Sequence, residues 1–235
     1  MKVKVRIVKS IDDKEAAEKY IQGHHKVLEA YGVTKVTSAD TSWINNPNCF
    51  LILVENLEDG RVLGGGRIQM KTENNDLPLV EAVREIDVGI NQYMDSIGTA
   101  QVAEFCGLWN SKEVAGFGIG SIYLGRVGAA ICTQLNVNKL LALCSPATLR
   151  NCKRVGFSII ESLGVDGKFY YPKEGLIATA LEINNVENLP NATNDDRDFI
   201  FKLRKDINFS VQESGPKGEM SIEFDIKIMS STMVM

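Results

Sequence analysis

The feature that most constrains the fold is a glycine-rich turn between an apolar strand and an apolar helix. Residues 99–109 read as a central strand, and the alternating glycines Gly116, Gly118 and Gly120 follow after a short loop. Because glycine has no Cβ, successive backbone N–H groups there can converge on one point. A helix that begins at this turn adds its unpaired N–H groups and the positive end of its dipole. The pattern predicts a backbone cradle for a diphosphate, formed by residues 115–121.

Two common nucleotide cradles do not fit this spacing. A P-loop continues into Lys and then Ser or Thr, whereas no lysine follows Gly120. The dinucleotide fingerprint Gly-x-Gly-x-x-Gly contains a two-residue gap that residues 116–120 lack. The strand expected next, residues 138–144, also ends without the acid that would bind a ribose. A structural alternative stays open, in which the glycines only let the helix start pack tightly against a strand.

The residues around this turn resemble the core of the GNAT superfamily of N-acyltransferases. The family's phosphate loop reads Arg/Gln-x-x-Gly-x-Gly/Ala, and residues 115–120 match it except at Ala115. A strand follows some twenty residues later, and the helix after it closes in the pair Gly156-Phe157, as in the family. The resemblance implies an α/β (α+β) fold with a mixed, mostly antiparallel central sheet and helices on both faces. Two splayed parallel strands of that sheet admit the pantetheine arm of the acyl donor.

The resemblance assigns cofactor-binding roles to the phosphate loop, the strand edge beside the splay and one residue of the second cofactor helix. These residues are Leu108, Trp109, Asn110, Ala115, Gly116, Phe117, Gly118, Ile119, Gly120, Ser121 and Arg150. Gly107 is expected to form a bulge that opens the strand edge, whose N–H groups polarise the thioester carbonyl. Trp109 is either the floor of the pantetheine channel or an ordinary core tryptophan.

Glu104, Ser145 and Cys152 are the candidate catalytic residues. Glu104 is a charged residue in an apolar strand, where an unpaired carboxylate is costly and burial raises the pKa toward that of a useful base. The alternatives are a solvated face or pairing with an arginine such as Arg67 or Arg84. Cys152 stands where the family often has the tyrosine that protonates the leaving thiolate, although a packed cysteine fits the position too. Ser145, at the tip of the second central strand, is the other candidate acid or a helix N-cap.

The resemblance predicts an N-acyltransferase that moves an acyl group from acetyl-CoA or a longer acyl-CoA to a small-molecule primary amine. One alternative is an acyl carrier protein as donor. Residues 104–108 are similar to a strand of acyl-homoserine-lactone and long-chain N-acyl amino acid synthases, as are residues 163–171 to a later region of those enzymes. The second alternative is a non-catalytic acyl-CoA-binding or sensing module, since Ala115 and Cys152 both replace residues that assist turnover.

Composition limits the possible partners. The formal net charge of −4 offers no general attraction to nucleic acid or anionic membranes, so neither is expected as a partner. No apolar run approaches membrane-spanning length, and the alternating pattern of residues 1–8 predicts a strand rather than a signal peptide. The five cysteines show no Cys-x-x-Cys spacing, which indicates free thiols and a cytoplasmic location. No cluster of ligand residues has metal spacing, and no metal is expected.

The resemblance in strand order implies an acyltransferase domain over residues 1–183. A stretch rich in Asn, Asp and Pro then marks the start of a C-terminal extension over residues 184–235. The extension is expected to form a short helix, residues 198–204, and a β-hairpin. This hairpin either covers an edge of the sheet or pairs with a second copy of the chain in a homodimer. Elsewhere, helices are expected from a Ser10 cap to about residue 31, over residues 78–97 with a break at Gly89, and from 116 to about 135.

The only two histidines are adjacent, His24 and His25. They fall in the middle of the first expected helix beside polar residues, and this pattern favours a solvated face for both. The resemblance places this helix at the border of the acceptor site.

Overall fold

The computed structural model describes residues 1–235 except 31, 34–35, 99–100, 118–119 and 229–235. Its strands are β1 (Lys2–Lys9), β2 (Cys49–Asn56), β3 (Val62–Met70), β4 (Val102–Asn110), β5 (Lys139–Cys144), β6 (Ser158–Ile159), β7 (Lys168–Tyr170), β8 (Ile177–Ile183), β9 (Ser210–Gly215) and β10 (Gly218–Asp225). Its α-helices are α1 (Lys14–Ala30), α2 (Pro78–Arg84), α3 (Gly89–Ile97), α4 (Ser121–Ile131), α5 (Pro146–Arg154) and α6 (Asn194–Lys205). Two 3₁₀ turns, η1 (Thr37–Ala39) and η2 (Ser42–Asn45), follow α1.

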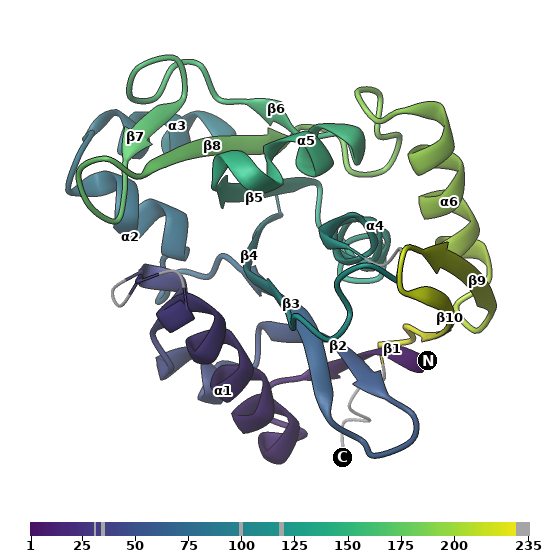
Figure 1. Cartoon of the computed structure of the whole chain (residues 1–235). Coiled ribbons are helices and arrows are strands. Elements are labelled where there is room, and N and C mark those ends of the chain that lie inside the picture. The colour runs from purple at the N-terminus through teal and green to yellow at the C-terminus, as the bar shows by residue number, and fades with distance from the viewer. Residues whose placement is uncertain (31, 34–35, 99–100, 118–119, 229–235) are drawn as a thin grey trace, which may run out of the picture.

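Within the described residues, all strands form one mixed sheet. The order is β6-β8-β5-β4-β3-β2-β1-β10-β9, and β7 pairs with β8. The pairs β4–β5 and β1–β10 are parallel, and the others are antiparallel. Helices α1 and α2 lie on one side of β3 and β4, and α4 and α6 lie on the other (Figure 1). The predicted fold class, a mostly antiparallel sheet with helices on both faces, is confirmed.

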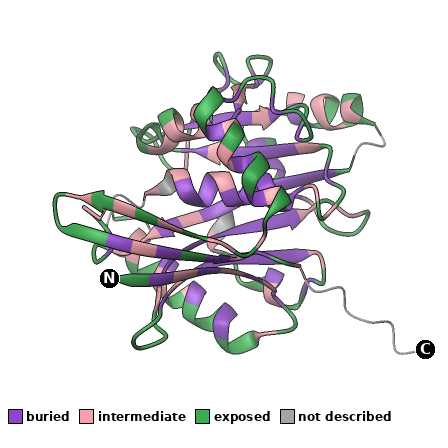
Figure 2. Cartoon of the chain, turned by 90° about the vertical axis from the view of Figure 1, so that its right-hand side faces the viewer, coloured by how far each residue is buried: buried purple, intermediate pink, exposed green. Residues whose placement is uncertain are grey.

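The sheet separates two hydrophobic layers. The larger layer packs α4 and α6 against one face, with Phe105, Val127 and Ile200 among its buried members. On the other face, α1 covers Leu51 and Leu53 of β2, while α2 and α3 cover Leu141 of β5. Figure 2 shows buried residues running along the strands, with exposed residues on the outer sides of the helices. Alternating strand side chains therefore serve two layers, as a sheet covered on both faces requires.

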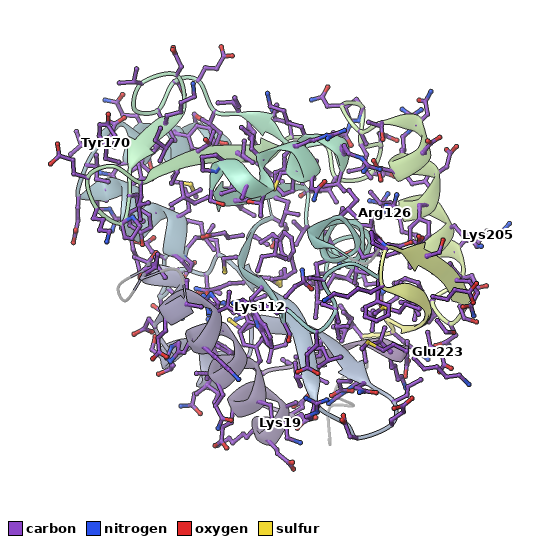
Figure 3. The ribbon with its side chains drawn as sticks, in the orientation of Figure 1. Lys19, Lys112, Arg126, Tyr170, Lys205 and Glu223 are labelled. Atoms are coloured by element: carbon purple, nitrogen blue, oxygen red, sulfur yellow. The ribbon has the colours of Figure 1, made fainter. Side chains whose placement is uncertain are left out.

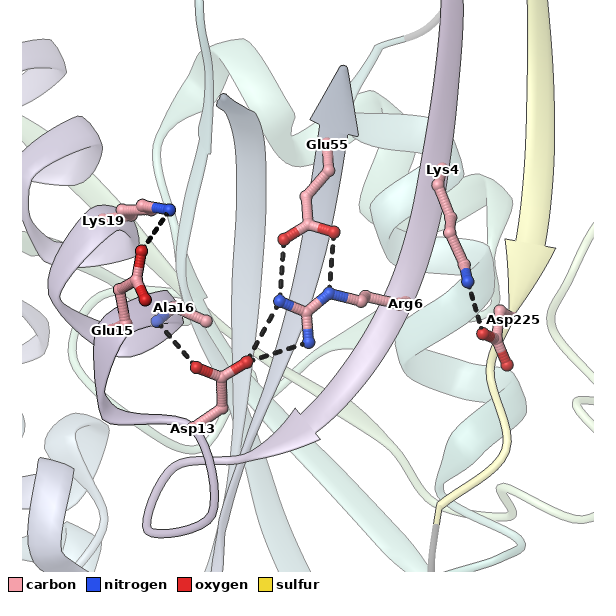
Figure 4. A network of polar contacts seen from close by, with 8 residues as sticks. All are labelled: Lys4, Arg6, Asp13, Glu15, Ala16, Lys19, Glu55 and Asp225. Atoms are coloured by element: carbon pink, nitrogen blue, oxygen red, sulfur yellow. Dashed lines mark hydrogen bonds and ion pairs between the residues drawn. The ribbon is translucent and has the colours of Figure 1, made fainter. Parts of the chain in front are cut away.

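The first helix begins at Lys14, and the prediction that Ser10 caps it is wrong. Ser10 is fully buried, and its hydroxyl donates to a backbone carbonyl at the end of η2 at 2.9 Å. The side chain of Asp13 takes the capping role, since one of its oxygens accepts from the Ala16 N–H at 3.0 Å. The other accepts from Arg6, whose guanidinium also binds Glu55 of β2 at 2.7 and 2.8 Å (Figure 4). Charge pairing across β1 and β2 thus sets where α1 starts.

Other predicted boundaries differ because turns interrupt the helical pattern. The helix expected from residue 116 is α4, which begins only at Ser121, since Gly116 has a φ of +92° that no right-handed helix accommodates. It ends at Ile131, before a turn in which Asn136 is left-handed with a φ of 55°. The predicted break at Gly89 is confirmed, and it separates α2 from α3.

The C-terminal segment is continuous with the rest of the fold. Its helix, α6, is longer than predicted, and it is capped by the hydroxyl of Thr193. The hairpin β9–β10 covers the sheet edge, because β10 pairs along β1 from Lys2↔Ser221 to Arg6↔Asp225. Ile222 and Phe224 of β10 belong to the same buried cluster as the core of α4. A division of the chain at residue 183 stays a prediction, and the hairpin takes the first of its two predicted roles.

Candidate functional site

The two parallel central strands pair only at one end. β4 and β5 are joined from Val102↔Lys139 to Glu104↔Leu141, and β4 then continues to Asn110 with only β3 beside it within the described residues. Beyond Glu104, the β5 side of β4 therefore has no strand partner among the described residues. An open strand edge of this kind can receive an extended ligand and polarise its carbonyl groups. The predicted splay of two parallel strands is present.

A β-bulge bends β4 at the start of this open edge. Gly65 pairs with Trp109 and Arg67 with Cys106, so Gly107 and the residue after it together oppose one residue of β3. Gly107 has a φ of +60°, and its carbonyl accepts a hydrogen bond from the Tyr20 hydroxyl of α1 at 2.5 Å. A Cβ at Gly107 would lie 2.3 Å from that hydroxyl oxygen, so only glycine fits here. The predicted bulge at Gly107 is observed.

Glu104 lies buried at the point where β4 and β5 part. Its side chain is 2% exposed, and Oε2 accepts a hydrogen bond from the backbone N–H of Leu79 in the first turn of α2 at 2.7 Å. Burial raises the pKa of Glu104 to about 7, although the Leu79 N–H and the charge of Arg67 oppose the rise. The solvated alternative for Glu104 does not hold, and Arg84 pairs with Asp76 instead. A carboxyl with a pKa near 7 is suited to proton abstraction.

Polar side chains of β3 and α1 surround Glu104 on the same face of the sheet. Gln69, the register partner of Glu104 on β3, is 6% exposed and donates through Nε2 to the Asp76 carbonyl at 3.2 Å. Arg67 is 1% exposed and lies over the Trp43 ring, with its guanidinium carbon 4.6 Å from the ring centroid. Its positive charge opposes the rise that burial gives the pKa of Glu104 and Cys106. A buried polar patch therefore interrupts the hydrophobic layer on this face.

The prediction of a solvated face for the two histidines is wrong for His24. His24 is 5% exposed and its ring lies 6.0 Å from that of Tyr20, whereas His25 is exposed. Burial, together with the charges of Arg67 and His25, lowers the pKa of His24 to about 4. His24 is therefore neutral at pH 7. His24 follows Tyr20 by four residues and lies on the same buried face of α1, toward the bulge at Gly107.

The predicted phosphate loop follows β4 at the surface. Val114 is buried and anchors the loop, while Ala115 is exposed and Gly116 half-buried. The N–H of Phe117 bonds the Val114 carbonyl at 3.3 Å. Gly118 and Ile119 lie outside the described residues. Gly120 precedes α4 as its N-cap, and Ser121 is the first helical residue, so the N-terminus of α4 lies at the end of the predicted loop. Binding of a diphosphate there stays a prediction.

The strand-edge residues divide between the two faces of the sheet. Leu108 packs against the α4 layer, whereas Trp109 is 4% exposed and belongs to the layer under α1. Asn110 ends β4 beside Gly64 of β3, within the described register. Of the two alternatives for Trp109, its packing against Tyr20 favours a core tryptophan that supports the bulge from beneath.

The contact between α1 and Trp109 gives a first testable prediction. A Cβ added at Gly23 in α1 would lie 2.1 Å from Cη2 of Trp109. Gly23→Ala should lower the free energy of unfolding by about 1–3 kcal/mol, despite the higher helix propensity of alanine, because the core must move. The control is Gly128→Ala in α4, where the added Cβ would lie 3.5 Å from Phe105, an ordinary contact. Urea titration of both variants checks this, and equal stabilities would contradict the packing of Trp109.

The candidate acids lie on the β5 side of the gap. Ser145 is exposed and directly follows β5, and its side chain makes no capping hydrogen bond to α5. Cys152 of α5 is half-buried and hydrogen-bonded to Cys144, the last residue of β5. That hydrogen bond and burial raise the pKa of Cys152, so its thiol stays protonated. Arg150 is exposed on the outer side of α5. It lines a separate groove of ≈ 490 Å³ with Pro146, Leu149, Lys153, Arg154 and Thr193.

A second groove of ≈ 610 Å³ opens beside α1, η1 and the turn between β7 and β8. It is lined by His25, Leu28, Glu29, Val33, Val36, Thr37, Ala39, Asp40, Glu85, Tyr171 and Pro172. Thr37 joins this groove to the Glu104 site, because its hydroxyl donates to the Pro78 carbonyl at 2.9 Å and Leu79 is next in the chain. The Thr37 N–H donates to the Tyr171 hydroxyl at 2.6 Å.

No sequence signal marked this groove, since its walls come from segments far apart in the chain whose residues follow no shared motif. Gln69 is a polar residue in the strand next to that of Glu104, and this could have marked it as part of the site. The sequence does not give the strand register, however, and only the register shows that Gln69 lies opposite Glu104.

Two features of the described residues bear on other classes of site. No grouping of three or more His, Cys, Asp or Glu side chains suited to a metal ion occurs among them. Within the same part of the chain, no helix combines the length and apolar character that crossing a bilayer demands.

Comparison with known proteins places the geometry among acyltransferase folds. No protein-family model matches the sequence, and no curated protein matches it either. FeeM, an N-acyl amino acid synthase from uncultured soil microbes, superposes with a TM-score of 0.59 at 14% identity, over 80% of this chain and 99% of FeeM. MesI, a CoA-dependent acyl-homoserine lactone synthase, gives 0.54 at 13% identity, over 86% and 95%. ElaA of Escherichia coli gives 0.52 at 8% identity, over 77% and 98%.

Because the sequence identities are low, the structural similarity establishes the fold alone. The neighbours include N-acyl amino acid and acyl-homoserine lactone synthases and an N-acetyltransferase, in agreement with the resemblance to the GNAT superfamily and its synthases. Each neighbour is covered almost completely, while part of this chain has no counterpart in it.

Proposed function

We propose that this protein is an N-acyltransferase that transfers an acyl group from acyl-CoA to a primary amine by direct attack on the thioester. The observation that carries the proposal is Glu104, a buried carboxyl with a pKa raised to about 7 at the point where two parallel strands part. An open strand edge and a glycine-containing loop that leads into a helix start lie on the same strand-to-helix connection. These are the parts that acyl transfer from a thioester needs.

In this mechanism the carboxylate of Glu104 accepts a proton from the acceptor ammonium, which makes its nitrogen nucleophilic. The nitrogen attacks the thioester carbonyl. The oxyanion forms beside N–H groups on the edge of β4 that has no paired strand beyond Glu104. The C–S bond then breaks, the amide forms, and the thiolate leaves with its electron pair. Cys152, whose thiol stays protonated, or Ser145 supplies the proton to that sulfur.

The groove beside η1 is the proposed acceptor site. Its lining includes the carboxylates of Glu29, Asp40 and Glu85 and no lysine or arginine among the described residues. This charge favours the ammonium form of the acceptor on entry. Thr37 connects the groove to Glu104 through the Pro78 carbonyl and the neighbouring Leu79 N–H. Acyl carrier protein is the competing donor, because Arg150 and Lys153 present positive charge on the outer side of α5. A cytoplasmic location stays a prediction.

The deciding experiment combines donor binding with thiol release. The protein is incubated with acetyl-CoA and longer acyl-CoAs, or with acyl carrier protein loaded with the same chains, together with a panel of amines. Thiol release that depends on both donor and amine supports the proposal, and the faster donor class identifies the natural thioester. Binding of acyl-CoA without turnover, unchanged by Glu104→Gln, indicates the sensing module instead. If no thioester binds in a thermal-shift measurement, the acyltransferase and the sensing module are both rejected.

A further inference from the structure

The C-terminal hairpin touches the phosphate loop directly. The backbone N–H of Lys217, in the turn between β9 and β10, donates to the Gly116 carbonyl at 2.9 Å. Its ammonium lies 3.5 Å from the Lys112 carbonyl, at the start of the same loop. A Cβ placed on Gly116 would lie 3.0, 3.2 and 3.4 Å from Cγ, Cδ and Cε of Lys217. The lysine side chain therefore lies along residues 112–116, which lead into the loop.

Further contacts hold the hairpin in this position. The Tyr123 hydroxyl in the first turn of α4 donates to the Glu213 carboxylate of β9. The ring of Phe117 lies next to Gly218, where an added Cβ would be 3.8 Å from Cε1. The pairing of β10 with β1 fixes the whole hairpin to the sheet. The position of Lys217 is thus set by strand pairing and two contacts to the loop and helix, not by the lysine alone.

A positive charge from the hairpin lies beside the loop. The acid of the segment before the glycines, Glu113, is turned to Arg61 at 3.0 Å and is neutralised there. At the loop position where the resembling family has Arg or Gln, this chain has Ala115, which offers only its backbone. Lys217 is a cation whose side chain lies against Gly116, next to that position.

We propose that Lys217 is a donor-binding residue: the C-terminal hairpin supplies the positive charge at the phosphate loop that Ala115 does not. This inference rests on the proposed function, because it assigns the ligand of the loop as the diphosphate of CoA. It gives the extension a role in the donor site. It also identifies Lys217 as a residue that distinguishes a donor with phosphates from one without them, since its ammonium pairs with phosphate oxygens.

The test uses the full-length protein, the variants Lys217→Met and Lys217→Arg, and Lys205→Met as the control. Lys205 lies at the outer end of α6, away from Lys112 in Figure 3. Isothermal titration measures Kd for CoA at low and high salt. Steady-state kinetics compare acetyl-CoA with S-acetyl-pantetheine, which has the same thioester and no phosphate. Thermal unfolding monitors the fold of each variant.

We expect Lys217→Met to raise Kd for CoA and KM for acetyl-CoA about tenfold, the effect of losing one hydrogen bond to a charged group. Its kcat and its KM for S-acetyl-pantetheine should stay within about twofold, and its CoA affinity should depend less on salt. Lys217→Arg should restore most of the affinity because it keeps the charge, and Lys205→Met should match the unaltered protein.

Three results overturn the inference while leaving the proposed function intact. They are unchanged CoA affinity in Lys217→Met, an equal loss toward both donors, and an arginine variant as weak as the methionine one. An equal rise in KM for acetyl-CoA and S-acetyl-pantetheine would mean that the lysine only supports the structure of the loop. Failure of the unaltered protein to bind CoA rejects the proposed function and the inference together.

Discussion

Replacement of Glu104 by glutamine is expected to lower kcat about 10²- to 10⁴-fold, the usual contribution of a general base. Glutamine has nearly the same shape, and its amide oxygen can still accept the Leu79 N–H that now bonds Oε2 at 2.7 Å. The site should therefore keep its structure and its CoA affinity while losing the group that takes the proton. Thiol release under saturating donor and amine measures the effect.

The pH dependence separates a base from a structural carboxylate. In the unaltered protein, kcat/KM should rise with pH through about 7, where Glu104 loses its proton. This rise of kcat/KM with pH should be absent from Glu104→Gln. Glu223→Gln, a change of the same kind at an exposed position of β10, should have full activity and the unaltered profile. A Glu104→Gln variant with near-normal kcat would remove Glu104 from the mechanism.

Glu104→Gln should also raise the free energy of unfolding at pH 8. The pKa of Glu104 rises from its ordinary value of 4.5 to about 7 on folding, so the folded state holds this proton more tightly than the unfolded state. The stabilisation by that proton is complete below pH 4.5 and is lost as pH rises through 7. Glu104→Gln keeps a neutral group throughout and should be more stable than the unaltered protein by about 3 kcal/mol near pH 8. Denaturant titrations at pH 5 and pH 8 measure the difference, which should be small at the lower pH.

Replacement of Asp196 by alanine is expected to destabilise the fold by about 3 kcal/mol, the low end of the cost of breaking a buried ion pair. Asp196 is fully buried in the first turn of α6. Its carboxylate accepts from Nε of Arg126 in α4 and Nε of Arg154 in α5, both at 2.8 Å, and from the Thr193 hydroxyl at 2.6 Å. The cost lies at the low end because the Arg154 side chain is 40% exposed and can regain water.

A matched control is the neighbouring acid Asp195, which is exposed in the same helical turn. Asp195→Ala should change the free energy of unfolding by no more than about 1 kcal/mol, through the helix dipole. Asp196→Ala should lower Tm by about 6–12 °C at neutral pH, given about 2–4 °C per kcal/mol for a chain of this size. Similar Tm values for the two variants would show that Asp196 does not join α4, α5 and α6.

Acid should reduce the difference in the free energy of unfolding between Asp196→Ala and the unaltered protein. Burial alone would raise the pKa of Asp196, but the hydrogen bonds from Thr193, Arg126 and Arg154 outweigh it and lower the pKa below 3.8. Stability from the ionised carboxylate is therefore present above pH 3.8 and is lost as pH falls through the lowered pKa.

Local signals in the sequence were enough to predict the frame of the site. The alternating glycines, the apolar strands on either side and the Gly-Phe pair after the second helix predicted the order of elements and the fold class. A charged residue in an apolar strand identified Glu104 as a buried carboxyl, and Gly107 was correctly expected to form the bulge. Such features follow from backbone conformation and from the cost of burying charge, which act over a few residues and can be read directly.

Tertiary packing alone decided which distant residues meet. Ser10 is no helix cap because its hydroxyl bonds to the end of η2, and no periodicity reports that contact. Thr37 and Tyr171 meet at the groove beside η1, and Lys217 reaches Gly116, from segments with no shared pattern. Sequence spacing determines neighbours within one helix or strand, whereas contacts between elements depend on strand register and on how the layers pack.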